Sequence, residues 1–143
     1  MDMLRGFPIV ITLPVQWGDQ DALGHVNNTV YLRWFESSRI AYFERIGLST
    51  AVLTEKIGPI LASISCDYRR QIRYPETVHV GARINRIGRS SLAMEHEVVC
   101  ESSRALSAVG GAVIVIFDYR AQQSHPIPDR LRREIEALEG RSF

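Results

Sequence analysis

The sequence predicts an α+β fold in which one long apolar helix is followed by a curved antiparallel sheet of about five strands. The first observation is a change of hydrophobic period, from helical spacing in residues 29–46 to alternation of apolar and polar side chains after residue 60. The second is that the links between the alternating segments are short, as they are between antiparallel neighbours. A length of 143 residues fits one domain, so residues 1–143 are expected to share one core.

The first strand is predicted in residues 9–17, which are rich in side chains typical of strands. Pro14 cannot donate a ladder hydrogen bond, so this strand is expected at an edge of the sheet or at a bulge. Residues 18–27 contain Gly, Asp and Asn at short intervals and are predicted to form a loop.

The long helix is predicted from about residue 29 to residue 46. Side chains at helical spacing are Tyr31, Trp34, Phe35, Ser38, Tyr42 and Ile46. Leu32, Ile40 and Phe43 widen the apolar surface, so the helix is expected to be largely enclosed. Gly47 ends the helix, and residues 49–57 are expected to add a short helical turn before residues 58–59 break the pattern.

The remaining strands are predicted from period-two alternation. They lie in residues 60–68, 77–84, 92–98 and 106–119. The last of these is apolar on both faces, which favours a central position in the sheet. Residues 128–139 are predicted to form a charged amphipathic helix that Pro128 and Asp129 open.

Composition excludes several classes of protein. The formal net charge of +1 argues against a nucleic-acid binder with a broad basic face. Cys66 and Cys100 stand far apart and outside any CxxC pattern, so neither a disulfide framework nor a zinc site is expected, and a cytoplasmic setting fits best. The longest apolar stretch, residues 105–117, is too short for a membrane span. We therefore expect a soluble protein without a membrane partner.

Arginine outnumbers lysine, since Lys56 is the only lysine among 17 basic residues. Arginines recur around the middle strands, at positions 69, 70, 73, 83, 86 and 89. The planar guanidinium suits a phosphate group, so a small phosphorylated ligand is one interpretation of this grouping. Ordinary solvated charges at strand ends are the other, and the sequence leaves both open.

The loop before the long helix carries the chemistry. Asp19 and Asp21 precede Gly24, and Asn27 and Asn28 stand where the helix begins. A carboxylate beside free backbone N–H groups at a helix start supplies what is needed to attack a carbonyl and to stabilise the resulting oxyanion. The alternative is that both aspartates only cap turns.

Residues 17–39 carry a resemblance to a known family. They contain Asp-x-Asp-x-x-Gly-His-Val-Asn-Asn followed by Tyr-Leu-x-Trp-Phe-Glu-x-x-Arg. This segment resembles the hotdog-fold acyl-CoA thioesterases, specifically the 4-hydroxybenzoyl-CoA thioesterase-like group. Residues 68–75 and 87–91 resemble that group's second-strand exit and strand-to-strand turn. The order of elements agrees over nearly the whole chain.

The resemblance implies hydrolysis of an acyl-CoA thioester to free acid and coenzyme A. It assigns the catalytic carboxylate to Asp21, as nucleophile or general base, and the oxyanion-binding backbone N–H to Asn28, where related enzymes carry tyrosine or histidine. It also implies a homodimer, often assembled into a homotetramer, with sites between subunits. Residues expected to support the site are His25 and Asn27, which brace the loop.

The substrate-binding residues follow from the same resemblance and from the arginine grouping. Candidates for the coenzyme A phosphates are Arg69, Arg70, Arg73, Arg89 and the neighbouring Ser90. Trp17 is a candidate wall of the acyl pocket, together with Trp34, although plain core positions remain the alternative.

Glu36 is expected to pair with Arg39 or Arg33 at helical spacing, with lining of the pocket as its alternative role.

The absence of several catalytic and cofactor-binding motifs excludes further classes of enzyme. The sequence has no GxSxG elbow, GxGxxG turn, P-loop or HExxH pattern, so no cofactor and no metal are expected. Asp19-x-Asp imitates the start of a calcium loop, but Leu23 and Val30 stand where oxygen donors are needed. Two alternatives to a thioesterase remain: an enoyl-CoA hydratase or dehydratase on the same fold, and a noncatalytic acyl-CoA-binding module.

Overall fold

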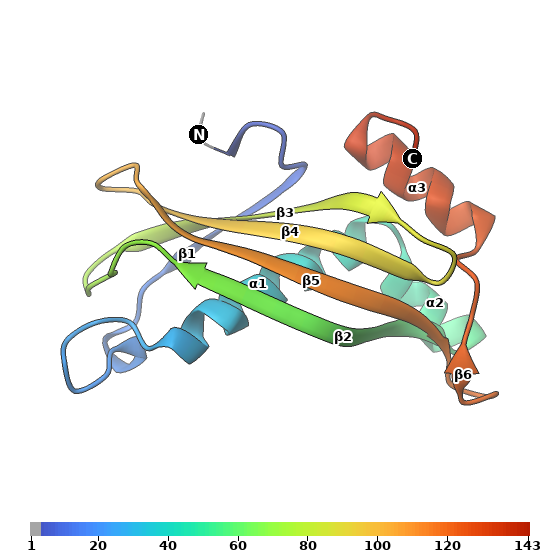
Figure 1. Ribbon diagram of the computed structural model, residues 1–143, viewed down its shortest axis with the longest axis horizontal. Coiled ribbons are helices and arrows are strands. Elements are labelled where there is room, and N and C mark those ends of the chain that lie inside the picture. Colours follow the sequence, from blue (N-terminus) through green and yellow to red (C-terminus); the bar gives the residue numbers. More distant parts are fainter. Residues whose placement is uncertain (1–3) are drawn as a thin grey trace.

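A computed structural model describes residues 4–143, without the side chains of residues 50 and 53. The sheet is antiparallel and has the strand order β1-β3-β4-β5-β2, with the short β6 paired to β5 (Figure 1). Its strands are β1 (Ile9–Pro14), β2 (Ile57–Tyr68), β3 (Thr77–Ile87), β4 (Ser91–Cys100), β5 (Leu106–Asp118) and β6 (Gln123–Ser124). The helices are α1 (Asn28–Arg45), α2 (Leu48–Glu55), α3 (Asp129–Glu139) and the 3₁₀ turn η2 (Trp17–Asp19).

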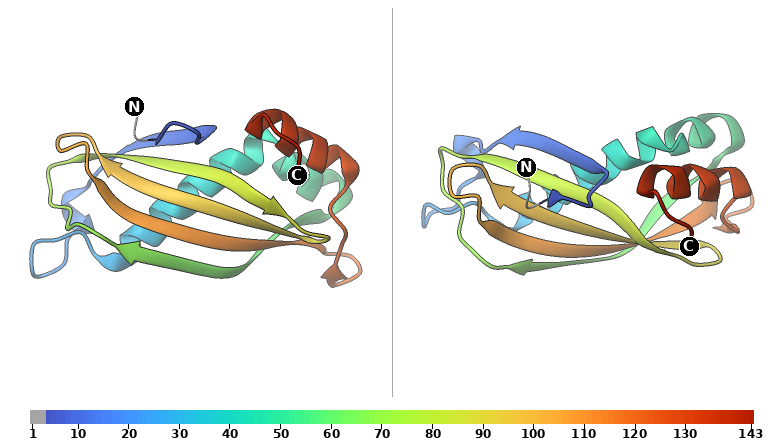
Figure 2. Two further views of the ribbon diagram at one scale, coloured as in Figure 1. Left: turned by 45° about the horizontal axis from the view of Figure 1, so that its top comes forward. Right: turned by 90° about the horizontal axis from the view of Figure 1, so that it is seen from above.

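Helix α1 runs along one face of the sheet, as the views in Figure 2 show. Phe35 and Tyr42 are fully buried between helix and strands. Gly110 in β5 permits the close approach, because a Cβ atom there would lie 2.2 Å from Cε2 of Phe35. The predicted α+β architecture, a long helix covered by an antiparallel sheet of five main strands, is confirmed.

The helix is less enclosed than the sequence predicts. It packs mainly on β3 and β1, which leaves the side toward β2 comparatively open. Arg33, Glu36 and Ile40 are exposed, and Ile40 keeps 47% of its surface accessible. The expectation of a largely enclosed helix is therefore wrong for the single chain, since the sheet covers only one side of α1.

Two predicted boundaries need correction. Strand β2 begins at Ile57, where the sequence predicts a helical turn and a break. Gly58 and Pro59 instead pair with Phe117 and Ile116. Because β2 is an edge strand, proline is tolerated there. The first strand ends at Pro14 rather than at residue 17, and β6 is too short to be recognised from a pattern.

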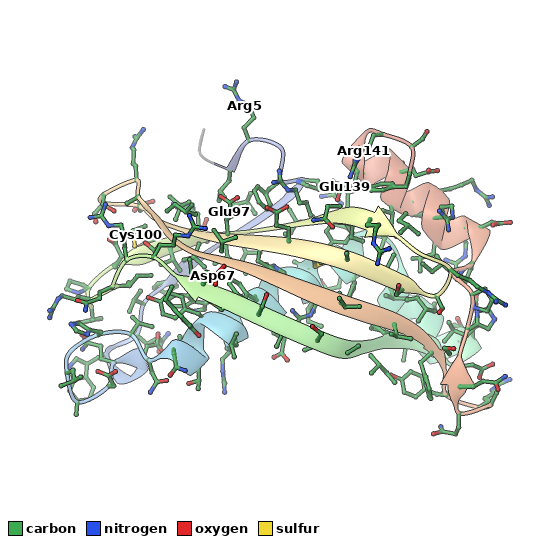
Figure 3. The ribbon with its side chains drawn as sticks, viewed as in Figure 1. Arg5, Asp67, Glu97, Cys100, Glu139 and Arg141 are labelled. Atoms are coloured by element: carbon green, nitrogen blue, oxygen red, sulfur yellow. The ribbon has the colours of Figure 1, made fainter. Side chains whose placement is uncertain are left out.

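Helix α3 is fastened to the rest of the fold through its last residue. The Glu139 carboxylate accepts a hydrogen bond from the Tyr42 hydroxyl at 2.6 Å and one from the Ile84 N–H at 2.8 Å. Figure 3 shows Glu139 where α3 lies beside β3. These bonds tie α3 to both α1 and the sheet. Among the helices described in residues 4–143, none is long and apolar enough to cross a membrane.

Candidate active site

The loop between β1 and α1 is braced by Asp19. Its Oδ2 accepts a hydrogen bond from the Gln16 N–H at 2.8 Å, which caps the turn η2. Its backbone carbonyl accepts the Asn27 N–H at 2.9 Å. Asp19 is thus occupied in holding the two ends of the loop together.

Among the residues that the structure describes, Asp21 accepts hydrogen bonds through one carboxylate oxygen only. Oδ1 accepts the N–H groups of Leu23 at 2.9 Å and His25 at 3.5 Å, so it closes the tight turn that Gly24 completes in the left-handed conformation. Within residues 4–143, Oδ2 has no recorded hydrogen-bond partner. The same side chain therefore fixes the turn with one oxygen and presents the other to its surroundings.

The first backbone N–H of α1 is also free of partners in the described part of the chain. Asn27 caps the helix: its side-chain oxygen accepts the Thr29 N–H at 3.0 Å, and its carbonyl accepts the Val30 N–H at 3.0 Å. The Asn28 N–H, which neither bond uses, stands at the positive end of the dipole of an 18-residue helix, where a negative charge is stabilised.

Asp21 and Asn28 line one cavity of about 300 Å³. Its other lining residues are His25, Val26, Tyr31, Tyr68, Arg69, Arg70 and Gln71. The structure thus brings five of the predicted site residues together, from the loop, the start of α1 and the end of β2. A carboxylate and a helix start that line one cavity can supply a base or nucleophile and an oxyanion donor to the same carbonyl group.

Two tyrosines in this cavity are absent from the sequence prediction of the site. The Tyr68 hydroxyl donates to the Asn28 carbonyl oxygen at 2.9 Å, and the rings of Tyr31 and Tyr68 meet edge to face at 4.9 Å. Burial raises the pKa of Tyr31 to about 12 and also raises the pKa of Tyr68. Both hydroxyls therefore stay protonated at neutral pH. The signal in the sequence that could have pointed to Tyr68 is the segment of residues 68–75, which begins with this tyrosine and resembles the family.

His25 is held by an arginine from the segment that follows β2. The Arg73 guanidinium donates from Nη2 to His25 Nε2 at 2.9 Å, which fixes that nitrogen as the acceptor. Arg73 is thereby engaged in bracing the loop and does not line the cavity. His25 and Asn27 both have the bracing geometry that the loop requires.

Residues 15–135 match the thioesterase-like superfamily. The chain belongs to this superfamily. Its fold is the hotdog fold, and the predicted assignment to thioester hydrolases is confirmed at the level of the superfamily.

Individual relatives agree with the assignment. A thioesterase from Thermus thermophilus, solved with coenzyme A and Zn, is 39% identical with a TM-score of 0.86, covering 97% of this chain and 99% of that one. Bacillus subtilis YsmA is 28% identical over 102 residues, or 71% of this chain and 67% of that protein. Danio rerio THEM6 is 32% identical over 91 residues, or 64% of this chain and 45% of its own length.

Besides Arg73, four predicted binding residues of this thioesterase-like protein lie outside the cavity. Trp17 is 74% exposed, whereas Trp34 is buried against Tyr31. Arg89 and Ser90 occupy the turn between β3 and β4, at the opposite end of the molecule from the loop (Figure 1). Their carbonyls accept N–H groups that join this turn to β5 and to the segment before α3. Within one chain they do not meet Asp21.

The expected ion pair of Glu36 is not formed. No ion pair or hydrogen bond between Glu36 and either Arg33 or Arg39 is present in the described residues. The prediction of an ion pair is wrong: Arg39 is buried whereas Glu36 is exposed, and the exposed Arg33 side chain does not reach Glu36. The same described part of this thioesterase-like chain holds no group of three or more His, Cys, Asp and Glu side chains able to bind a metal ion.

Proposed function

We propose that the chain hydrolyses acyl-CoA thioesters with Asp21 as the catalytic carboxylate. The observation that carries the proposal is that Asp21 and Asn28 line the same cavity, while Asp21 Oδ2 and the Asn28 N–H make no hydrogen bond within residues 4–143. The thioester carbonyl oxygen accepts this N–H, and the carbonyl carbon lies toward Asp21. The coenzyme A bound to the Thermus thermophilus relative supports coenzyme A as the carrier.

Asp21 acts in one of two ways. As a nucleophile, Oδ2 bonds to the carbonyl carbon, the carbon–sulfur bond breaks with its electrons on sulfur, and water then hydrolyses the mixed anhydride. As a general base, Oδ2 takes a proton from the water that attacks the same carbon. In both cases the negative charge that develops on the carbonyl oxygen is stabilised by the Asn28 N–H.

The leaving group places little further demand on the protein. A thiol with a pKa of about 8.5 leaves as a thiolate, so no strong general acid is needed to protonate its sulfur. Tyr68 supports the oxyanion site indirectly, because its hydroxyl bonds to the carbonyl of Asn28. We infer that Tyr68 positions the first turn of α1.

Isotope labelling separates the two roles of Asp21. During many turnovers in H₂¹⁸O, direct attack followed by addition of water to the Asp21 carbonyl of the anhydride incorporates ¹⁸O into the Asp21 carboxylate, which mass spectrometry of the peptide detects. General-base catalysis leaves this carboxylate unlabelled and labels only the released acid, as does an anhydride that water opens at the acyl carbon. An Asp21 that carries ¹⁸O therefore establishes the nucleophilic role and excludes a purely general-base role.

Arg69 and Arg70 are proposed to bind the phosphates of coenzyme A, because both line the cavity and both are exposed. Replacing Arg70 by Glu should raise KM for an acyl-CoA about ten-fold but leave KM for the matching pantetheine thioester within about two-fold. Arg45→Glu, at the exposed far end of α1, is the control. Equal changes of KM for both substrates contradict a phosphate role.

Arg89 and Ser90 can bind coenzyme A at this cavity only if two or more copies of the chain assemble. Strand β2 forms a sheet edge, and its exposed Leu61 and Tyr68 offer apolar area to a second copy. We infer a homodimer or homotetramer in which these residues of a second copy approach the cavity. Sedimentation that shows a monomer at assay concentration excludes this role.

A thiol-release screen tests the proposed function directly. Saturated, aromatic and α,β-unsaturated acyl-CoA thioesters are supplied at one concentration, and free thiol is measured. The proposal predicts thiol release from at least one class of thioester. Hydration of an enoyl-CoA without thiol release indicates a hydratase instead, and tight binding without turnover indicates a binding module.

A further inference from the structure

The stretch between β2 and β3, residues 69–76, has no regular secondary structure. Figure 1 shows it at the same end of the molecule as residues 20–27, which we call the Asp21 loop. Its first part, residues 69–71, lines the cavity that also contains Asp21. Its second part, residues 72–74, is bonded to the Asp21 loop itself. One short stretch thus contains both the arginines proposed to bind coenzyme A and the contacts that hold the loop.

Residues 72–74 hold the Asp21 loop through three hydrogen bonds, one at each residue. These bonds run from the Val26 N–H to the Ile72 carbonyl oxygen at 2.8 Å, from Arg73 Nη2 to His25 Nε2 at 2.9 Å, and from the Tyr74 N–H to the Gln20 side-chain oxygen at 3.2 Å. Within residues 4–143, every hydrogen bond that joins residues 20–26 to a distant part of the chain is one of these three. The attachment of the loop therefore depends on residues 72–74.

The rest of the Asp21 loop has little support from packing. Residues 21–23 are exposed, and Leu23 keeps 77% of its surface accessible. Val26 is buried in the same apolar cluster as Ile72, so the packing of the loop also depends on this stretch. Exposed segments with few apolar contacts open at a low cost in free energy. A shift of residues 72–74 is therefore sufficient to release the loop.

Arg73 reaches Asp21 through His25. The Arg73 guanidinium holds the imidazole of His25. The His25 carbonyl oxygen accepts the Asp21 N–H at 2.8 Å, and the His25 N–H donates to Asp21 Oδ1 at 3.5 Å. Arg73 does not line the cavity, so it can influence the reaction only by positioning the loop.

The first part of the stretch is anchored to the sheet and carries two cationic side chains. The N–H groups of Arg69 and Arg70 both donate to the Ser107 carbonyl oxygen of β5, at 2.9 Å and 3.2 Å. Both side chains are exposed, and neither forms an ion pair within the described residues. A phosphate bound by these guanidinium groups restricts the backbone of residues 69–71, because charge-assisted hydrogen bonds fix the side chains. Ile72, which accepts the bond from the loop, follows directly.

We propose that binding of coenzyme A phosphates at Arg69 and Arg70 orders the Asp21 loop through residues 72–74, with Arg73 as a positioning residue. This inference rests on the proposed thioesterase function and adds that the substrate itself regulates the site. Binding energy from the phosphates, far from the thioester, is then used to place Asp21 against the carbonyl carbon. The value of kcat, as well as KM, therefore depends on the phosphate-bearing part of the substrate.

The test compares an acyl-CoA with the matching acyl-pantetheine, which has the same thioester but no phosphates. At saturation, kcat in the natural protein should be about ten-fold higher for the acyl-CoA, a typical size for coupling between two sites. Arg73→Met removes the donor to His25 and leaves Arg69 and Arg70 in place. It should lower kcat for the acyl-CoA to within about two-fold of kcat for the acyl-pantetheine, which itself should change by less than about three-fold.

Two further variants control this comparison. Arg73→Lys keeps a donor for His25 Nε2 and should retain most of the difference in kcat between the two substrates. Arg45→Met removes an exposed arginine at the far end of α1 and should leave both rates unchanged. Circular dichroism and thermal unfolding confirm that each variant is folded before its rates are compared.

Hydrogen exchange of the Val26 N–H, measured by NMR, provides a readout independent of turnover, because this group bonds to Ile72. Saturating coenzyme A should slow the exchange about ten-fold in the natural protein, whereas pantetheine should leave it unchanged. In Arg73→Met, coenzyme A should no longer slow the exchange.

Equal kcat values for the two substrates in the natural protein overturn the proposal. So does an Arg73→Met protein in which both rates fall by the same factor, since a purely structural brace affects both substrates alike. Failure of the thioesterase function looks different, because no thioester then releases thiol while coenzyme A still slows the Val26 exchange. An exchange rate that coenzyme A leaves unchanged overturns the coupling in either case.

Discussion

The buried His96 makes a quantitative prediction about stability at acidic pH. Its side chain is fully buried in β4, stacks on Phe35 at 4.9 Å between ring centres, and places Nδ1 3.0 Å from the Ser38 Oγ and 3.2 Å from the Gly81 carbonyl oxygen. Nε2 has no partner in the part of the chain that the structure describes. Burial, assisted by the positive charge of Arg39, lowers the pKa of the imidazole from 6.5 to about 3.

The direction of this pH effect follows from the number of protons that the folded and the unfolded state bind. Below pH 6.5 the unfolded chain protonates this histidine, while the folded chain keeps it neutral until the pH approaches 3. The unfolded state then binds more protons, so the free energy of unfolding falls as the pH falls. Between pH 8 and pH 5 the loss from this one group is about 2 kcal/mol, because the unfolded imidazole is almost fully protonated at pH 5.

Urea unfolding at pH 8, 7, 6 and 5 measures this loss. The natural protein should lose about 2 kcal/mol more over this range than His96→Gln, which has no imidazole to protonate in the unfolded state. His125→Gln, the same substitution at a more exposed histidine, is the matched control. Parallel curves for the natural protein and His96→Gln refute the reasoning, as does an NMR titration in which folded His96 protonates near pH 6.5.

Two further substitutions test the packing of α1 against β5 and the cap at the start of α1. Gly110→Ala should lower the free energy of unfolding by about 1–3 kcal/mol, because the added Cβ collides with Phe35. Gly111→Ala is the control in the same denaturation assay. It should lower the free energy of unfolding by less, because its added Cβ meets no atom closer than 3.4 Å. Asn27→Ala should cost about 1 kcal/mol by removing the cap on the Thr29 N–H, while Asn27→Asp should retain most of the stability. A Gly110→Ala protein as stable as the natural one contradicts the packing described for α1, and a neutral Asn27→Ala contradicts the cap.

Much of the fold could be predicted because the relevant signals are local. The change from helical to alternating period separates α1 from the strands, and Pro14 correctly indicates an edge strand. The loop geometry is local as well, since Asp21, Asn27 and their hydrogen-bond partners lie within a few residues of one another. A short motif therefore accounts for the turn and the cap themselves, although Arg73 adds a brace from outside the motif through His25.

Other features depend on contacts between distant segments. Tyr68 reaches the start of α1 only because β2 lies at the sheet edge beside β5, and no local pattern encodes that strand order. Spacing places Glu36 near Arg39 along the helix, but it does not reveal that only the arginine is buried. In a sequence, Gly58 and Pro59 look like the end of a helix or strand. They continue β2 because this strand lies at the edge of the sheet.

The most direct test of the central claim is the kcat/KM of Asp21→Asn on the best thioester found, with Asp19→Asn measured beside it. Asparagine keeps the oxygen that closes the turn but lacks the carboxylate charge, so the account predicts a fall of about 10²–10⁴-fold for Asp21→Asn. Asp19→Asn, which keeps the oxygen that accepts the Gln16 N–H, should stay within about three-fold. An Asp21→Asn protein that retains more than about a tenth of the natural activity contradicts the assignment of Asp21 as the catalytic carboxylate.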